Sequence, residues 1–189
     1  MEGLLSGLPD MLIFIILYGP LAMGIFIMVK LTKWFVIKKE INNRMLLIAL
    51  VINVLNFYLI YDLMTPSPEV SSGNGNPFIP NILISFLLFI SFCVVFSKKI
   101  IEILSKQKTW ISILVIAITL AITWFSVVSQ MDFVLTIKEA LYYPLDNWLT
   151  WWKSIHLNYL YFNPYTFLLG ICISGLVAGI LGLSKRKIV

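Results

Sequence analysis

This sequence is short of the residues that usually perform catalysis or bind metals. Its 189 residues include one histidine, His156, and two cysteines, Cys93 and Cys172. A single histidine excludes a cluster of histidine ligands within one chain. The two cysteines fall at different expected depths in two apolar runs, so a disulfide between them is not expected. A glycine-rich phosphate-binding loop is also missing. The sequence therefore predicts no catalytic residue, no metal site and no cofactor.

Charge is scarce as well. Only 12% of the residues are charged, whereas 60% are hydrophobic. The apolar residues gather in five runs, and a helix of about 20 residues crosses a hydrocarbon core of about 30 Å. The runs cover approximately 11–30, 45–64, 78–97, 110–130 and 165–183. They predict an all-α, polytopic integral membrane protein with five transmembrane helices, in which residues 1–189 form a single membrane domain.

The basic residues lie almost entirely on one side of these spans. Twelve of the fourteen Lys and Arg residues fall between the first and second spans, between the third and fourth, or after the fifth, and seven of the nine Asp and Glu residues fall on the other side. Short cytoplasmic loops retain Lys and Arg. We therefore expect a multi-pass protein of the cell membrane, that of a prokaryote, with its N-terminus outside and its C-terminus inside. Contact with anionic lipid explains the clustering of the Lys and Arg residues, so no nucleic-acid partner is expected.

Polar side chains inside the second and fourth spans predict one polar face in the bundle. Asn53 and Asn56 are three residues apart in the second span, and we expect their amides to hydrogen-bond near Thr119 and Thr123 of the fourth. The hydroxyl stripe of the fourth span can line a polar path, or it can pack on a neighbour while bonding its own i−4 carbonyls, and the sequence favours packing. That stripe consists of Ser112, Thr119, Thr123, Ser126 and Gln130.

Small residues form two adjoining ridges in the fifth span. Small residues at four-residue steps let another helix backbone approach closely, so this pattern predicts helix packing. It leaves open whether the neighbouring helix belongs to this chain or to another. The ridge residues are Gly170, Ser174, Gly175, Ala178, Gly179 and Gly182.

The segment 131–163, between the fourth and fifth spans, is rich in aromatic residues. Asp132 is placed to cap a short helix that Pro144 stops. A second, amphipathic helix is predicted over 146–162. Tryptophan favours the headgroup level of a membrane, so we expect this helix to lie in the outer interface. The sequence leaves open whether the segment also forms a lid or a partner-docking surface over the bundle. Its anchors would be Trp148, Trp151 and Trp152.

The interfacial helix would bring acidic and imidazole groups together at an outer mouth of the bundle. Asp146 and His156 lie on the predicted helix, and Asp62 closes the second span on the same side. If the protein has an outer ligand, we expect it at these three residues.

Three functions are compatible with this pattern. The first, which we favour, is a non-catalytic membrane subunit or sensor. It would assemble through helix packing, as a homo-oligomer or with a membrane or cytoplasmic protein, and dock that partner on its basic cytoplasmic face. The second is a small oligomeric channel or transporter, which the lack of a mid-span charge disfavours. The third is an outer-leaflet lipid-modifying enzyme, which the scarcity of catalytic groups disfavours.

Overall fold

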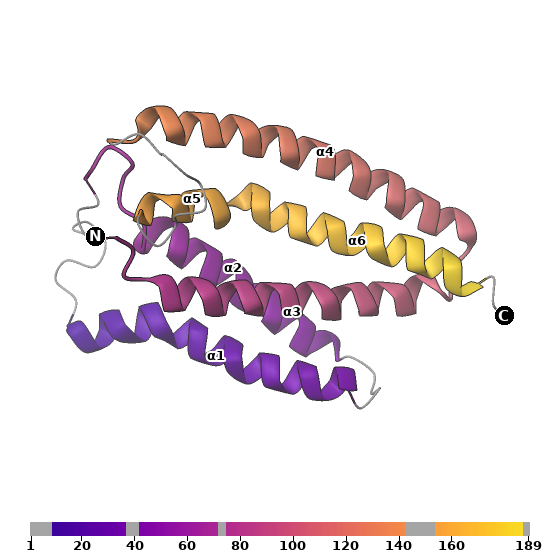
Figure 1. Ribbon diagram of the computed structural model, residues 1–189. Coiled ribbons are helices and arrows are strands. Elements are labelled where there is room, and N and C mark those ends of the chain that lie inside the picture. Colours follow the sequence, from indigo (N-terminus) through magenta and orange to yellow (C-terminus); the bar gives the residue numbers. More distant parts are fainter. Residues whose placement is uncertain (1–8, 37–41, 72–74, 143–153, 187–189) are drawn as a thin grey trace.

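The computed structural model of this chain describes residues 9–36, 42–71, 75–142 and 154–186. In those ranges it is a set of long helices that run side by side (Figure 1). In chain order they are α1 (Asp10–Val36), α2 (Asn43–Tyr58), the π-helical turn η1 (Leu59–Leu63), α3 (Ile79–Leu104), α4 (Thr109–Ala140), the 3-10 turn η2 (Ile155–Leu157), the short α5 (Asn158–Tyr161) and α6 (Pro164–Arg186).

Helices α3 and α6 form the centre of the bundle. Helix α6 lies between α4 and α3, and α3 also packs on α1 and α2 (Figure 1). Helix α4 therefore joins the rest of the bundle mainly through α6. The largest buried cluster has the same centre, since it includes Phe57 of α2, Phe89 and Phe92 of α3, and Phe162 just before α6.

Four helical segments are long and apolar enough to cross a membrane. These are Asn43–Leu63, Ile79–Ser105, Thr109–Ala140 and Ile155–Ser184. The chain thus has the helices of a multi-pass membrane protein. The apolar part of α1, Phe14–Ile27, is shorter than these four.

The two ends of the bundle differ in charge. The end drawn on the left in Figure 1 holds η1, the described parts of the loop 64–78 (64–71 and 75–78), the end of α4 and the start of α6. We call it the acidic end, because it carries Asp62, Glu69, Asp132 and Glu139 beside Lys138. The opposite end, which we call the basic end, carries Lys30, Arg44, Lys98, Lys99, Lys106 and Lys108 beside Glu102.

Asparagine side chains start two of the helices. The Asn42 side chain accepts a hydrogen bond from the Arg44 backbone N–H at 2.9 Å and so caps α2. At the start of α6, the Asn163 Oδ1 atom accepts from the N–H groups of Tyr165 and Thr166 at 2.9 and 3.0 Å. Pro164 follows, at a position where its missing N–H costs nothing. The predicted start of the fifth span after Asn163–Pro164 agrees with this helix.

The region after the predicted fourth span differs from our expectation. Asp132 does not cap a new helix, because α4 continues through it as one helix of 32 residues. The sequence from Met131 to Ala140 contains no glycine or proline. Continuing a helix costs less than starting a second one, so the chain has no reason to break at Asp132.

The predicted amphipathic helix over 146–162 is also different where the structure describes it. Residues 146–153, with Asp146, Trp148, Trp151 and Trp152, lie outside the described residues. In the described part, from residue 154 onward, Ser154 has an extended backbone, η2 is a 3-10 turn and α5 is a single α-helical turn, so these residues do not form one continuous α-helix. Ile155 and Asn158, expected on opposite faces, are both buried. The polar face is covered because the Asn76 amide from the loop 64–78 donates to the Asn158 Oδ1 atom at 2.7 Å.

Candidate functional site

A groove of about 430 Å³ lies between α2 and α6 at the acidic end of the bundle. Two of its lining residues, Val54 and Tyr58, are 47% and 51% exposed, so the groove is open on the outer surface of α2. Its volume is in the range of sites for small organic ligands. The lining is Val54, Phe57, Tyr58 and Tyr61 on the α2 side, and Phe162, Asn163, Pro164, Phe167 and Leu168 on the α6 side.

The wall of this groove consists of aromatic rings fixed against one another. The Phe57 ring lies 4.9 Å from the Phe162 ring and 5.0 Å from the Phe167 ring, centroid to centroid. Phe89 of α3 supports them from behind, 4.8 Å from Phe57 and 5.0 Å from Phe167. Edge and offset contacts of this kind hold the rings in defined positions, so the wall is in place before any ligand arrives.

Polar groups stand at one end of the groove. The Tyr58 hydroxyl donates to the Asp62 carboxylate at 2.9 Å, and both residues are exposed. Asp62 belongs to η1, whose i to i−5 spacing is rare and occurs frequently at functional sites. Tyr61 packs its ring 4.9 Å from Tyr159 and 6.3 Å from Phe133 of α4. Asp62 is thus a carboxylate beside an aromatic, apolar groove.

His156 does not stand at an open mouth, as the sequence led us to expect. It is buried, with Nδ1 3.2 Å from the Pro66 carbonyl oxygen and Nε2 2.8 Å from that of Val70. Both ring nitrogens therefore face backbone carbonyls of the loop 64–78. The imidazole holds this loop against η2, and it is not free to act on a ligand beside Asp62. Asp146, the third residue of the expected mouth, lies in the undescribed segment.

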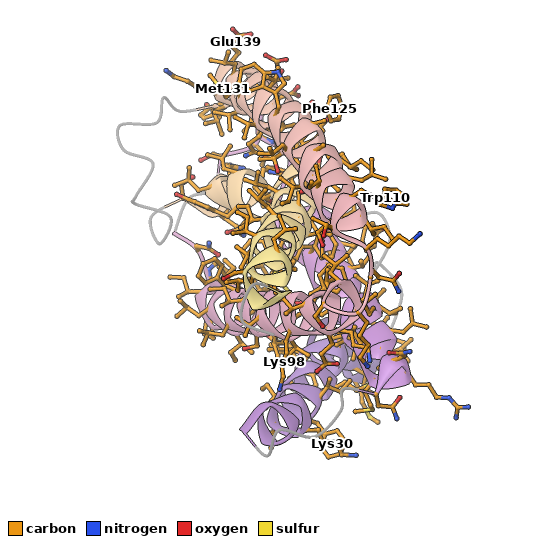
Figure 2. All side chains as sticks on the ribbon, turned by 90° about the vertical axis from the view of Figure 1, so that its right-hand side faces the viewer. Lys30, Lys98, Trp110, Phe125, Met131 and Glu139 are labelled. Atoms are coloured by element: carbon orange, nitrogen blue, oxygen red, sulfur yellow. The ribbon has the colours of Figure 1, made fainter. Side chains whose placement is uncertain are left out.

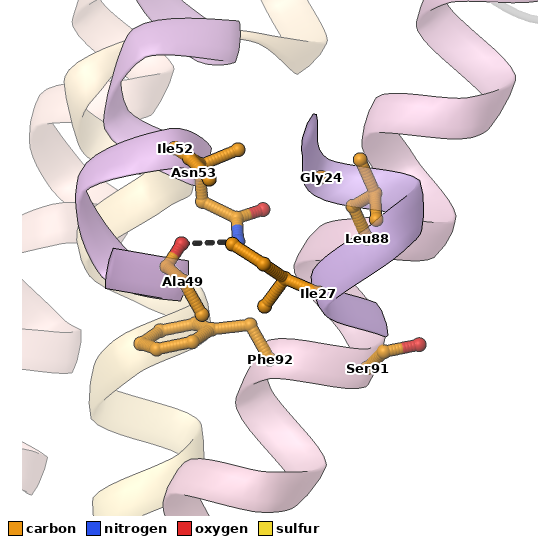
Figure 3. A pocket seen from close by; sticks show the side chains of 8 residues that line it. All are labelled: Gly24, Ile27, Ala49, Ile52, Asn53, Leu88, Ser91 and Phe92. Carbon is orange, nitrogen blue, oxygen red and sulfur yellow. Dashed lines mark hydrogen bonds between the residues drawn. The ribbon is translucent and has the colours of Figure 1, made fainter. Parts of the chain in front are cut away.

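The amides of the second span do not reach the hydroxyls of the fourth, so the predicted hydrogen bonds to Thr119 and Thr123 are wrong. The Asn53 Nδ2 group donates to the Ala49 carbonyl of its own helix at 2.8 Å (Figure 3). Its Oδ1 atom and the Nδ2 atom of Asn56 are buried without a partner. The physical reason is the order of the helices, because α2 packs on α1 and α3, whereas α4 packs on α6.

The space beside Asn53 is small. It is lined by residues of α1, α2 and α3, and its volume is about 10 Å³ (Figure 3). That volume is about the minimum for a single water molecule. Gly24 and Leu88 belong to its lining. This space is a packing gap rather than a ligand site.

The hydroxyl stripe of α4 makes local bonds and faces α6. The Thr119 hydroxyl donates to the Val115 carbonyl at 2.7 Å, and Ser126 donates to Ile122 at 2.8 Å. At the acidic end, the Gln130 amide donates to the Leu160 carbonyl at 2.9 Å and so ties α4 to α5. The Thr123 hydroxyl is buried without a partner. Asn53, Asn56 and this stripe therefore belong to two separate interfaces rather than to one polar face.

The small residues of α6 lie where other helices of the same chain approach. An added Cβ atom at Gly175 would be 2.7 Å from Thr119, and one at Gly179 would be 2.6 Å from Ile116. One at Gly170 would be 2.5 Å from the Phe89 ring of α3. The other ridge residues, Ser174, Ala178 and Gly182, are buried as well.

The chain matches no known protein family, no curated protein and no solved structure. Among the described residues, no three His, Cys, Asp or Glu side chains are grouped closely enough to hold a metal ion.

Sequence reasoning missed the groove, although a signal for half of it was present. The α2 side of the groove has the spacing i, i+3, i+4 and i+7, which places its residues on one face of a helix. These residues are Val54, Phe57, Tyr58 and Tyr61. Asp62 was singled out, but as part of a mouth with His156. The other wall, Phe162 to Leu168, is brought to α2 by tertiary packing, which a local pattern does not encode.

Proposed function

We propose that this chain is a non-catalytic subunit or sensor of a cell membrane, and that it docks an acidic protein partner on its basic end. What supports the proposal is the gathering of exposed cations there. Arg44, Lys106 and Lys108 are exposed at the start of α2 and around the linker from α3 to α4. Lys99 pairs with Glu102 at 3.8 Å. Clustered cations attract an acidic surface over a distance of about 8–10 Å at ordinary salt.

The proposal includes the topology inferred from charge. Helix α1 would be the first of five spans, the N-terminus would lie outside, and the basic end would face the cytoplasm. The alternation of helix direction in Figure 1 puts the ends of α1, α3 and α6 and the starts of α2 and α4 at the basic end. Cytoplasmic retention of Lys and Arg is the argument for the orientation.

Helix α4 is the surface that we propose for assembly within the membrane. The α6 ridge, which the sequence suggested for this role, is filled by helices of the same chain. Helix α4 is the least buried of the four long apolar segments. Trp110, Phe125 and Met131 lie on its outside, away from the other helices (Figure 2). Ala117 and Ala121 are exposed four residues apart, the spacing that lets a second helix approach.

The two other functions receive less support. A polar path through the bundle would need the polar faces of α2 and α4 to meet, but α2 packs on α1 and α3 instead. An outer-leaflet enzyme would need a free acid or base near Asp62, but both His156 nitrogens face backbone carbonyls.

A photo-crosslinking amino acid at Gln107, which is exposed at the basic end, tests the docking. In cells we expect a cross-linked protein of defined mass, lost when Lys106 and Lys108 are both changed to Glu. The same amino acid at Glu139, exposed at the acidic end, is the control and should not give that product. Products from Gln107 that contain lipid alone, or a protein product that survives the charge reversal, would show that the basic end docks no acidic protein.

A further inference from the structure

The groove between α2 and α6 suggests a ligand of its own, independent of a partner at the basic end. We propose that it holds an acyl chain of a membrane lipid whose headgroup carries a primary ammonium, and that Asp62 binds the ammonium.

The lining and the position of the groove indicate that its ligand is a lipid acyl chain. Its walls are aromatic and aliphatic side chains of two segments, Asn43–Leu63 and Ile155–Ser184, that are long and apolar enough to cross a membrane. It opens past Val54 and Tyr58, which are exposed on the outside of the bundle. In a membrane, the molecules on that side are acyl chains. A chain that enters the groove meets Phe57 and Phe167, whose rings are already held in place.

The charge at the end of the groove identifies the headgroup. Asp62 is next to the last residue of the segment Asn43–Leu63, which is the depth at which headgroups lie. It is exposed, and among the described residues it has no cationic partner. None of the groove's lining residues is Lys or Arg. A headgroup that carries only negative charge would be repelled here, whereas one that ends in an ammonium can place that cation beside the carboxylate.

The geometry of Tyr58 and Asp62 favours a primary ammonium over a quaternary one. Tyr58 donates its hydroxyl proton to Asp62 Oδ2, so the Tyr58 oxygen and Asp62 Oδ1 remain as acceptors. An –NH₃⁺ group has three N–H donors and can bond to both, whereas a trimethylammonium group has none.

Lipid retention in native mass spectrometry tests this assignment. The full chain is placed in nanodiscs of equal parts phosphatidylethanolamine, phosphatidylcholine and phosphatidylglycerol with identical acyl chains, and the lipid that stays bound is identified. We expect one retained phosphatidylethanolamine per chain, preferred about tenfold over the other two, since a charge-assisted hydrogen bond corresponds to a ratio of about this size.

Three variants distinguish recognition of the lipid headgroup from binding of the acyl chain. Asp62→Asn keeps the shape of the side chain and should retain a lipid while losing the preference for phosphatidylethanolamine. Val54→Trp fills the groove and should lose the retained lipid altogether. Leu55→Trp is the control, because Leu55 is an exposed neighbour that does not line the groove, and it should behave as wild type. Val54 is itself exposed, so its replacement leaves the core intact.

Two results would overturn the proposal. If Asp62→Asn keeps the headgroup preference, or if the wild type shows none, Asp62 does not bind an ammonium. If Val54→Trp retains lipid as well as Leu55→Trp does, the retained chain does not occupy the groove.

Discussion

Gly179→Ala is the sharpest test of the contact between α4 and α6. The new Cβ atom would lie 2.6 Å from Cγ1 of Ile116 and 3.5 Å from the backbone oxygen of Ser112. Carbon atoms in contact are normally about 3.5–4.0 Å apart. Either the Ile116 side chain must leave its position, or the two helices must separate. Because Ile is branched at Cβ, its side chain has one strongly preferred rotamer in a helix and yields poorly.

The expected cost is the difference between two effects of opposite sign. Overpacking of a filled interface costs about 1–3 kcal/mol. Replacing glycine by alanine inside a helix gains about 1 kcal/mol in propensity. We therefore expect a net loss of up to about 2 kcal/mol. For a chain of this length, a loss of about 2 kcal/mol lowers the melting temperature by roughly 4–8 °C.

Thermal unfolding in detergent, followed by circular dichroism, measures this change. Val177→Leu on the same helix is the control, because Val177 is 42% exposed, and it should melt as wild type does. Ile116→Ala should remove the clash, so that the double variant with Gly179→Ala is more stable than the sum of the two single changes predicts. A Gly179→Ala protein that melts above the wild-type temperature, or additive effects in the double variant, would refute the steric argument.

Three further outcomes follow from the structure. Asn53→Ala should lower the free energy of unfolding by less than about 1 kcal/mol, because the one hydrogen bond of Asn53 is to its own helix. Asn53→Asp should prevent folding, because it buries a charge. Equal melting temperatures of the two variants would contradict this. His156→Ala should increase hydrogen exchange in residues 65–71, because the imidazole lies against the Pro66 and Val70 carbonyl oxygens of this segment, and unchanged protection would argue against that role. With Cys93 and Cys172 changed to Ala, an impermeant thiol reagent on intact cells should label Ser71→Cys but not Gln107→Cys; the reverse pattern would invert the proposed orientation.

The parts of the fold that were predictable are those set by local composition. Length and apolarity predicted long helices, four of which are long and apolar enough to cross a membrane, and Asn163–Pro164 predicted where α6 starts. The hydrogen bonds from Asn53 could not be predicted, because they depend on which helices become neighbours. Two polar faces in one sequence need partners, but periodicity alone does not say that they partner each other.

The candidate site shows the same limit more strongly. Asp62 was recognised from its place at the end of a span, but its expected neighbour His156 is turned inward by the loop 64–78. That loop is rich in proline and glycine, and sequence gives no periodic signal for how it packs. Aromatic residues such as Phe162 and Phe167 look like ordinary core until α2 is placed beside them.

The two ridges of small residues on α6 correspond to its two neighbouring helices, α3 and α4. Gly170 faces Phe89 of α3, and Gly175 faces Thr119 of α4. Five residues at 3.6 per turn place these two positions about 140° apart around the helix, as a helix between two partners requires. Since α4 joins the bundle mainly through α6, its position depends on one ridge. At the acidic end, Phe133 of α4 meets Tyr61 beside the groove, 6.3 Å between centroids. A shift of α4 on that ridge would therefore move the Phe133 ring that packs on Tyr61 of the groove lining.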